Sequence, residues 1–434
     1  MDLMEEIFKR LESLHPKIID LKLDRVKKLL RKLGSPERSL PPIIHVAGTN
    51  GKGSTIAMIK AGLKSSGLKT HVYTSPHLVR FNERIEVGNK RISEDALKEV
   101  LTECEKLNNY EPITFFEITT CAAFLAFSRE TADYTLLEVG LGGEFDATNV
   151  VQNPVVSVIT PISFDHKEYL GASIKEIAGA KAGIIKKGTP TIISNQSAEV
   201  KKILKAKCIE NGSDVIWSAE RFTVCSSRKS IIQKNCNKRI EFPFPNLIGP
   251  HQISNAMTAI STLTYLRVPE KHICKGLKST YWPARLQKIK EGSLYELIKT
   301  YNIDNQLWID GGHNEDASIQ LRKSMGFINK KNLHIIFGCL RNKDHISFLK
   351  NLAPVASSLS VVEIENQRSS LTNAVAVSSA RKVGWQKIYS ARNIRDAIKH
   401  ICSKKKVTES HTSILICGSL YLAGQALKEN GAEI

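Results

Sequence analysis

The sequence predicts an α/β fold with a largely parallel sheet, followed by a smaller α/β domain of Rossmann-like type. Apolar runs of strand length alternate with segments of helical period, which is typical of parallel sheets covered by helices. An apolar strand at 43–46 leads through a glycine-rich turn directly into a helix, and a second alternating series begins near residue 290. We therefore divide the 434 residues into a domain at 1–290 and a C-terminal domain at 291–434.

The first domain begins with an amphipathic helix at 1–14 and continues as alternating strands and helices. Strands are predicted at 43–46, 71–74, 134–138, 155–160 and 191–194. Helices are predicted at about 54–66, 93–108, 116–130 and 173–185. Short β-type pieces at 222–224 and 231–232 indicate a small antiparallel excursion within 215–250, before a helix near Gln252.

The C-terminal domain repeats the alternation of strands and helices on a smaller scale. Its strands are predicted at 307–310, 333–338, 359–363, 387–389 and 413–417, with helices between them. The chain shows no internal repeat and no low-complexity segment, so repeat architectures are not indicated.

The composition is that of a globular protein without a membrane partner. Hydrophobic residues make up 42%, and no run reaches the roughly 18 apolar residues that span a bilayer. The first residues carry acids and lack the basic start and apolar centre of a secretory signal. The nine cysteines include no CxxC pair and no zinc-finger spacing, so neither a disulfide framework nor a metal knuckle is supported. We therefore expect a reducing cytoplasm.

A net charge of +19, from 62 Lys and Arg against 43 Asp and Glu, favours anionic partners. The basic residues are spread along the chain, with only short runs such as those at 330–331 and 404–406. An arginine-rich arm and an aromatic-interleaved basic strand are both absent from the sequence. A basic surface, or attraction of a polyanionic small substrate, explains the charge equally well, and we expect no nucleic-acid partner.

The turn at 48–54, Gly-Thr-Asn-Gly-Lys-Gly-Ser, is a candidate phosphate-binding loop for a nucleoside triphosphate. Gly48, Gly51 and Gly53 leave backbone N–H groups free to converge on an anionic oxygen, which Lys52 neutralises. Because Gly53 follows the lysine, the hydroxyl that usually reaches magnesium at this position is missing. Another oxygen must take its place. The alternative interpretation is a glycine-rich β-turn with an incidental lysine.

Two further side chains follow strand ends and are expected beside this loop. Glu138 closes the strand at 134–138, and His166 follows the strand at 155–160. The ends of parallel strands gather at one edge of the sheet, so we expect Lys52, Glu138 and His166 there, with Glu138 as a magnesium ligand. Taken singly, a solvated glutamate and a structural histidine are the alternatives.

Several motifs occur in an order that is typical of one family. They are His-Val-Ala-Gly-Thr-Asn-Gly-Lys-Gly-Ser (45–54), Thr-Ser-Pro-His-Leu (74–78), Arg-Phe-Asn-Glu-Arg-Ile (80–85), Leu-Glu-Val-Gly-Leu-Gly-Gly with Asp-Ala-Thr-Asn (137–149), Lys-Ala-Gly-Ile (181–184), Asp-Gly-Gly-His-Asn (310–314) and Gly-Ser-Leu-Tyr (418–421). In this order they closely resemble the folylpolyglutamate synthase and dihydrofolate synthase family. That family belongs to the ATP-dependent amide ligase superfamily, which also contains the Mur ligases. The resemblance spans residues 18–421.

The resemblance implies two magnesium ions and a modified lysine. Ser75 of the Ser-Pro-His loop joins Glu138 at the first ion, which supplies the hydroxyl missing after Lys52. The second ion is held by Glu138, His166 and Lys181, the last carbamylated by carbon dioxide. A carbamate converts a cation into an anionic oxygen ligand, as a hard metal requires.

The resemblance also implies which residues contact the nucleotide and the substrates. Implied ATP contacts are Gly48, Thr49, Asn50, Gly51, Lys52, Gly53, Ser54, Thr55, Gln252, Asn255, Arg285 and Asp310. Implied substrate contacts are Thr114, Phe116 and Asp146 on the pterin side, with a pterin loop at 18–27, and His313 and Ser419 for the incoming glutamate. The chain departs from the family in its Gly-Gly-His at 311–313, in Arg-Asn-Lys-Asp at 341–344 and in a longer connection at 291–306.

The implied reaction is ATP-dependent addition of L-glutamate to dihydropteroate, to the glutamate tail of reduced folates, or to both. A carboxylate is a poor acyl donor, so an acyl phosphate intermediate is expected, with Lys52 and the magnesium ions neutralising charge. We expect a cytoplasmic monomer acting on small molecules. The nearest enzyme alternative is a Mur-type peptidoglycan precursor ligase. From another class, the alternative is a basic P-loop ATPase that binds nucleic acid.

Overall fold

A computed structural model of the chain describes residues 3–17, 19–234, 239–302, 304–327, 332–403 and 412–432. Ile18, at the start of the predicted pterin loop, and the basic runs at 330–331 and 404–406 lie outside these ranges. The chain forms two compact units. The first comprises Met1–His77, Phe81–Pro245 and Ile253–Thr280, and the second comprises Leu78–Arg80, Asn246–Gln252 and Tyr281–Ile434.

The first unit is built on a sheet whose strand order is β4-β3-β2-β5-β1-β6-β7-β8. In that order the strands are β4 (Lys90–Arg91), β3 (Ile85–Val87), β2 (Thr70–Tyr73), β5 (Tyr134–Glu138), β1 (Ile43–Ala47), β6 (Val156–Ile159), β7 (Thr191–Ile193) and β8 (Val215–Trp217). From β2 to β8 the strands run parallel. Every residue of β1 is buried, as expected for a strand covered on both faces. The predicted parallel sheet is confirmed.

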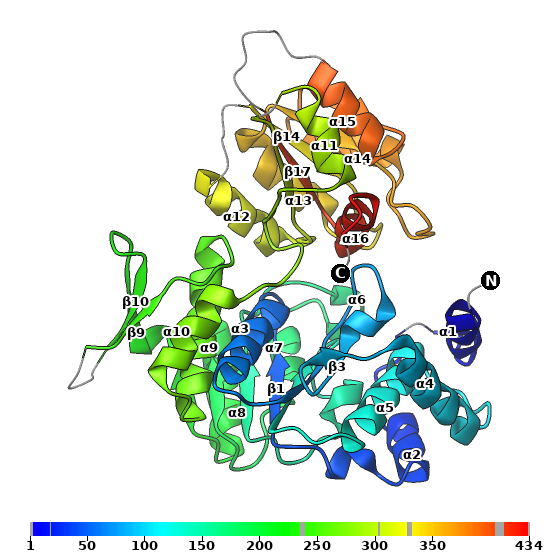
Figure 1. Cartoon of the computed structure of the whole chain (residues 1–434), viewed down its shortest axis with the longest axis vertical. Coiled ribbons are helices and arrows are strands. Elements are labelled where there is room, and N and C mark those ends of the chain that lie inside the picture. Colours follow the sequence, from blue (N-terminus) through cyan, green and yellow to red (C-terminus); the bar gives the residue numbers. More distant parts are fainter. Residues whose placement is uncertain are drawn as a thin grey trace. The chain divides into compact units, whose positions relative to one another are not determined.

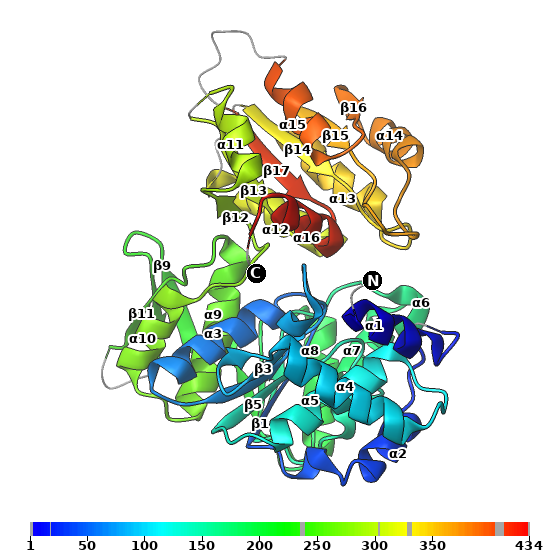
Figure 2. The same ribbon diagram turned by 45° about the vertical axis from the view of Figure 1, so that its right-hand side comes forward.

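Helices cover this sheet in groups that Figures 1 and 2 both show: α3, α9 and α10 lie together, and so do α1, α2, α4 and α5. The helices are α1 (Leu3–Ser13), α2 (Asp24–Lys32), α3 (Lys52–Ser65), α4 (Glu94–Asn108), α5 (Phe115–Ser128), α6 (Lys167–Leu170), α7 (Ile174–Ala182), α8 (Ala198–Glu210), α9 (Pro250–Tyr265) and α10 (Glu270–Ser279). Short 3₁₀ turns are η1 (Pro36–Arg38), η2 (Phe81–Arg84), η3 (Ala147–Val150) and η4 (Ser218–Arg221). In the described ranges, no helix is both long enough and apolar enough to cross a membrane.

Helices α3 and α10 pack through two glycines. A Cβ atom placed on Gly276 would lie 2.5 Å from the backbone nitrogen of Gly62, and one on Gly62 would lie 2.5 Å from Cδ1 of Leu263. The first distance is to backbone and is shorter than real Cβ contacts, so only glycine at position 276 permits this approach of the α3 and α10 backbones. The second distance is to a side chain of α9, which packs against Gly62 as well. The phosphate-loop helix α3 is thereby held against a segment that lies far later in the sequence.

The region at 215–250 differs in part from the prediction. Strands β9 (Phe222–Cys225), β10 (Ser230–Gln233) and β11 (Glu241–Pro243) form the expected antiparallel sheet. However, β8, which we placed in the same excursion, pairs in parallel with β7 and extends the main sheet. The antiparallel edge strands β3 and β4 were not predicted, because each is too short to produce a recognisable alternation.

The second unit contains a sheet of order β12-β13-β17-β14-β15-β16 with helices on both faces. Its strands are β12 (Gln287–Ile289), β13 (Gln306–Ile309), β17 (Ser413–Cys417), β14 (Leu333–Phe337), β15 (Ser358–Val361) and β16 (Ile388–Ser390). Its helices are α11 (Ser293–Lys299), α12 (Glu315–Ser324), α13 (His345–Leu352), α14 (Asn373–Lys382), α15 (Ile394–Ser403) and α16 (Leu420–Glu429), with 3₁₀ turns η5 (Met325–Phe327) and η7 (Ala353–Val355).

Only β12 runs antiparallel to its neighbour in this sheet, as far as the described residues show. Because β12 pairs with β13, the continuous part of the second unit begins at Tyr281, before the boundary that we predicted at residue 290. The assignment of separate functions to residues 1–290 and 291–434 stays a prediction. Two hydrophobic cores, one on each face of the sheet, explain the doubly wound arrangement.

Candidate active site

The glycine-rich turn lies between β1 and α3, at the end of one of the two central strands of the first unit's main sheet. Gly48 and Gly51 have φ values of +149° and +87°. A Cβ on Gly48 would lie 1.9 Å from Oγ1 of Thr160, and one on Gly51 would lie 2.5 Å from Oδ1 of Asn255. Side chains at these two positions would collide with Thr160 and Asn255, so this turn requires glycine at both.

Lys52 folds back over this turn. Its Nζ donates to the carbonyl oxygens of Gly48 and Thr49 at 3.2 and 3.4 Å. The same Nζ lies 3.9 Å from Oε1 of Glu138, the last residue of β5. The structure thus brings Lys52 and Glu138 together at one edge of the sheet, as the ends of neighbouring parallel strands predict.

The loop that follows β6 is hydrogen-bonded to the phosphate loop. Thr49 Oγ1 donates to the carbonyl of Ser163 at 3.0 Å, and the Ser163 N–H donates back to Thr49 Oγ1 at 3.1 Å. The backbone N–H groups of Thr49 and Asn50 both point to the carbonyl of Pro161. His166 follows on this loop, in the left-handed conformation (φ 51°), just before α6. The loop that carries His166 is therefore attached to Thr49 of the phosphate loop, at the predicted sheet edge.

Ser75 and Lys181 complete this group of predicted residues. The Ser75 N–H donates to Glu138 Oε2 at 3.2 Å, which places the Ser75 residue beside the carboxylate. Lys181 is buried in the last turn of α7, and its Nζ donates to the carbonyl of Gly48 at 3.0 Å. Among the described residues, no three His, Cys, Asp or Glu side chains are arranged to hold a metal by themselves.

Lys181 occupies an unusual environment for a lysine. Burial and the neighbouring positive charge of Lys52 lower the pKa of its ammonium group to about 7, against the opposing charges of Asp165 and Asp146. A large fraction of the side chain is therefore the neutral amine near pH 7, whereas a solvated lysine is almost fully charged.

The three residues predicted to face a pterin lie close to one another in the first unit. Thr114 caps α5, where its hydroxyl accepts the N–H of Glu117. The Phe116 ring lies against Gly140, where an added Cβ would be 2.5 Å from Cζ of the ring. The next residue, Leu141, donates its N–H to Asp146 Oδ2 at 2.8 Å. The turn after β5 therefore connects Phe116 with Asp146.

Asp146 is fixed by a hydrogen-bond chain that sequence reasoning missed. Thr148 Oγ1 donates to Asp146 Oδ1 at 2.6 Å, and His45 Nε2 lies 2.9 Å from Thr148 Oγ1. Burial lowers the pKa of His45 to about 3, so the ring is neutral. Because the Thr148 hydroxyl donates to Asp146, its contact with His45 requires the tautomer that donates from Nε2. Burial raises the pKa of Asp146. A histidine within the otherwise apolar segment Ile43–Ala47 was the available signal.

The two residues predicted to contact the substrate glutamate, His313 and Ser419, lie on neighbouring loops of the second unit. β13 and β17 are parallel neighbours, and the Gly418 N–H donates to the carbonyl of Gly312 at 3.2 Å. His313 and Ser419 follow directly on these two glycines. Ser419 caps α16, with its hydroxyl accepting the Tyr421 N–H at 3.1 Å. The geometry therefore brings His313 and Ser419 to the same end of the sheet.

Asp310 and Arg285 lie beside this pair of loops. Asp310 accepts the N–H groups of Leu286 and Gly312, both at 2.7 Å, and burial raises the pKa of its carboxyl group. Arg285 Nη1 donates to the carbonyl of Ala284 at 3.0 Å, and its charge acts on Asp310. Gly311 packs closely against Leu420, since an added Cβ would be 2.3 Å from Leu420 Cδ2, and it also lies near Arg285, whose Nη1 would be 3.2 Å away.

The remaining predicted nucleotide residues lie on or beside α9 and α3. Gln252 and Asn255 are both buried on α9, and Asn255 lies against Gly51 of the phosphate loop. Ser54 and Thr55 are buried in the first turn of α3. Thr55 Oγ1 is a buried hydroxyl without a hydrogen-bond partner in the described part of the chain. An unsatisfied hydroxyl behind a glycine cradle fits a loop that is completed by a phosphate.

Comparison with known proteins identifies the family to which the chain belongs. The Mur ligase middle domain matches residues 46–263, and the dihydrofolate synthetase C-terminal domain matches residues 293–429. The dihydrofolate synthase/folylpolyglutamate synthase of Bacillus subtilis is 32% identical over 430 residues, which cover 94% of each chain. The chain belongs to the folylpolyglutamate synthase and dihydrofolate synthase family.

Solved structures of this family have the same fold as the chain. The folylpolyglutamate synthase of Mycobacterium tuberculosis, complexed with ADP and AMPPCP, superposes with a TM-score of 0.86 at 29% identity and 100% coverage of both chains. Escherichia coli FolC, in complex with DHPP and ADP, gives 0.86 at 28% identity, covering 98% of this chain and 97% of that one. The resemblance inferred from the motifs is confirmed, and the chain is an ATP-dependent ligase of this family.

Proposed function

We propose that this ligase joins L-glutamate both to dihydropteroate and to the glutamate tail of reduced folates. The observation that carries the proposal is the convergence of Lys52, Glu138, Ser75 and Lys181 at one sheet edge, with Thr114, Phe116 and Asp146 in the same unit. The bifunctional relative in Bacillus subtilis is matched over 94% of its length, which favours both reactions.

We assign ATP to the loop at 48–55, with Asn255 beside it and Gln252, Arg285 and Asp310 as further contacts. The glycine cradle, the Lys52 ammonium group and the unsatisfied Thr55 hydroxyl support this assignment. When bound, MgATP supplies the phosphoryl group that converts a substrate carboxylate into an acyl phosphate. Lys52 stabilises the charge that develops during this transfer.

Two magnesium ions fit the donor set. Ser75 and Glu138 would hold one ion, since the Ser75 backbone N–H already contacts the Glu138 carboxylate. Glu138, His166 and a carbamylated Lys181 would hold the other. In carbamylation the neutral Nζ attacks carbon dioxide, a C–N bond forms, and one proton leaves to solvent. The burial of Lys181, which leaves much of the amine neutral, supports this modification.

Carbamylation of Lys181 can be tested by structure and by rescue. We expect a crystal structure with MgATP to show a carbamate on Lys181, and Lys181→Ala to be inactive but partly restored by short carboxylic acids. As a control, Lys186→Ala removes a nearby partly buried lysine that lies outside the predicted metal set. An unmodified Lys181 pointing to solvent in the MgATP complex would contradict the proposal.

In the second half of the reaction, the glutamate amine attacks the acyl phosphate. We assign the incoming glutamate to His313 and Ser419, whose loops are hydrogen-bonded to each other in the second unit. The glutamate amine attacks the acyl carbon, an amide bond forms, and phosphate leaves. Asp146, held by Thr148 and His45, and Phe116 orient the pterin end of the substrate.

The decisive experiment measures ADP release with ATP and L-glutamate, using dihydropteroate and tetrahydrofolate in separate reactions. We expect turnover with both acceptors and none without glutamate. Turnover with a UDP-linked peptide instead would favour a Mur-type ligase. ATP turnover that responds to nucleic acid but not to glutamate would favour the other alternative.

We further propose that the enzyme works as a cytoplasmic monomer. The cysteines of the described residues are free thiols, as a reducing compartment favours. Sedimentation of the purified protein tests the oligomeric state, with a single species near 48.3 kDa expected.

A further inference from the structure

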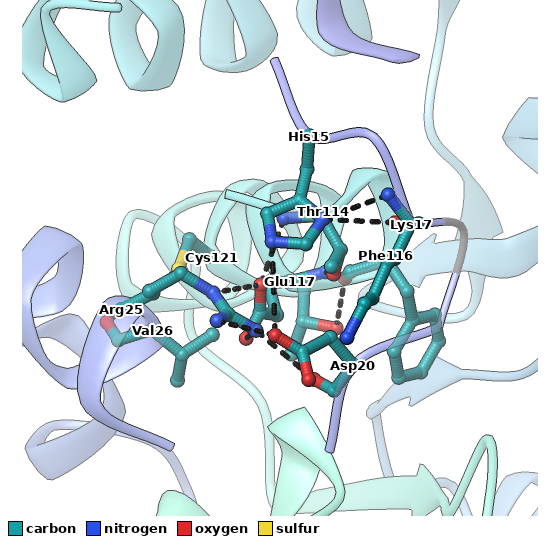
Figure 3. A network of polar contacts seen from close by, with 10 residues as sticks. His15, Lys17, Asp20, Arg25, Val26, Thr114, Phe116, Glu117 and Cys121 are labelled. Carbon is teal, nitrogen blue, oxygen red and sulfur yellow. Dashed lines mark hydrogen bonds and ion pairs between the residues drawn. The ribbon is translucent and has the colours of Figure 1, made fainter. Parts of the chain in front are cut away.

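Arg25 connects the segment after α1 to the start of α5 through a partly buried network of ion pairs (Figure 3). Its Nε and Nη2 donate to the two carboxylate oxygens of Glu117, both at 3.0 Å. Its Nη1 donates to Asp20 Oδ2 at 2.8 Å, and Nη2 also donates to the Asp20 carbonyl at 3.0 Å. One guanidinium group therefore closes the turn from Asp20 to Arg25 and fastens it to α5.

Glu117 shares its carboxylate between this turn and the end of α5. Oε2 accepts from Arg25 Nε at 3.0 Å and from the Thr114 N–H at 2.8 Å. In return the Glu117 N–H donates to the Thr114 hydroxyl at 3.3 Å, which completes a capping box. A displacement of Arg25 would therefore be transmitted to Thr114 and to the adjacent Phe116.

Burial and geometry separate this pair from an ordinary surface ion pair. The side chains of Arg25 and Glu117 are 19% and 5% exposed. Exposed pairs contribute little, whereas a two-pronged guanidinium–carboxylate contact away from solvent fixes the relative position of its partners. A lysine could supply the charge at position 25 but not this planar fork.

His15 lies next to the same turn. His15 Nε2 lies 3.7 Å from Asp20 Oδ2, and His15 Nδ1 accepts the Lys17 N–H at 3.1 Å. Arg25 thus faces two carboxylates, those of Asp20 and Glu117, and its removal would leave these like charges close together (Figure 3). The turn would then lose its order relative to α5.

We propose that Arg25 is a positioning residue for the pterin-bearing substrate. The proposal rests on the proposed function and on the pterin-side assignment that the family resemblance implies for Thr114, Phe116 and the loop at 18–27, of which residues 19–27 are described. Arg25 fixes these two segments before the substrate arrives, so binding does not have to order them. The affinity for the pterin-bearing substrate should therefore depend on Arg25. The affinity for ATP should not, because the phosphate loop is held by contacts of its own.

Steady-state kinetics of Arg25→Ala with dihydropteroate, ATP and L-glutamate varied in turn test this role. We expect the KM for dihydropteroate to rise by about 10-fold or more, with kcat and the KM values for ATP and glutamate within about 2-fold of wild type. Glu117→Gln keeps a capping acceptor but loses the charged pair, so it should raise the same KM without unfolding the start of α5.

Arg10→Ala is the matched control. Arg10 makes an equally two-pronged contact with Glu105, at 2.9 Å for both bonds, but joins α1 to α4 and is 50% exposed. Its KM values should equal those of wild type. If Arg25→Ala changes all three KM values alike, or only the melting temperature, Arg25 is merely structural. If Arg25→Ala does not fold, an unchanged KM in Glu117→Gln overturns the proposal.

The same measurements keep this inference apart from the proposed function. Wild-type enzyme that releases no ADP with dihydropteroate would refute the function itself. Wild-type turnover together with an unaffected Arg25→Ala would refute only the role of Arg25.

Discussion

Replacing Gly140 by alanine is a direct test of the pterin-side wall. A Cβ on Gly140 would lie 2.5, 2.9 and 3.0 Å from Cζ, Cε1 and Cε2 of Phe116, whereas ordinary contacts begin at 3.4 Å. The half-buried ring must therefore retreat by about 1 Å to restore an ordinary contact distance. Gly140 is not in the left-handed region, so the perturbation acts on Phe116 rather than on the backbone.

The expected magnitude follows from this displacement. Overpacking of this size costs about 1–3 kcal/mol, and a 1 Å misplacement of a substrate contact lowers turnover efficiency by up to about 100-fold. We therefore expect Gly140→Ala to raise the KM for dihydropteroate by about 10-fold to 100-fold, with little change in the KM for ATP. Steady-state ADP release and thermal unfolding of the same preparation measure both effects.

Gly179 provides the control for this substitution. It lies inside α7, and an added Cβ would meet nothing within 4 Å. Gly179→Ala should leave the kinetics unchanged and stabilise the helix by about 1 kcal/mol. If Gly140→Ala lowered the melting temperature but left the KM for dihydropteroate unchanged, Phe116 would not contact the substrate, and the assignment of the wall would be wrong.

Three further predictions concern the nucleotide, the metal and the amino acid. Lys52→Ala should abolish ligation while the protein stays folded, as judged by circular dichroism; near-normal turnover would refute the phosphate-loop assignment. Ser75→Ala should raise the magnesium requirement more than Ser54→Ala in a magnesium titration, because only Ser75 is expected to be a direct ligand. The reverse order would refute the assignment of Ser75 and indicate an ordinary phosphate-loop geometry. His313→Ala and Ser419→Ala should each raise the KM for glutamate by about 10-fold to 150-fold, since a lost hydrogen bond to a charged ligand costs roughly 1.5–3 kcal/mol. A change confined to the KM for ATP would place glutamate elsewhere.

The sheet and its site-bearing edge could be predicted because both depend on local patterns. β5 and β17 were predicted at Tyr134–Glu138 and Ser413–Cys417, as observed, since each is a short, mainly apolar run of strand length. The meeting of Lys52 with Glu138 follows from one rule, that parallel strands end at the same edge.

The contacts that the sequence did not reveal join residues far apart in the chain. Arg25 and Glu117 are separated by 92 positions, and His45 and Thr148 by 103. Each residue type is common, so neither pair produces a local signal. β8 was misplaced for a related reason: three half-buried residues carry no pattern that distinguishes the edge of a large sheet from a small one.

The glycine contact between α3 and α10 also affects how long α3 stays uncovered while the chain is being synthesised. During synthesis α3 emerges early, but Gly276, which covers Gly62, follows about 200 residues later. At about 5–20 residues per second, the phosphate-loop helix remains uncovered on that side for on the order of 10–40 s. Chains released before α10 should therefore expose an apolar helix face and aggregate, whereas chains released after it can bury that face.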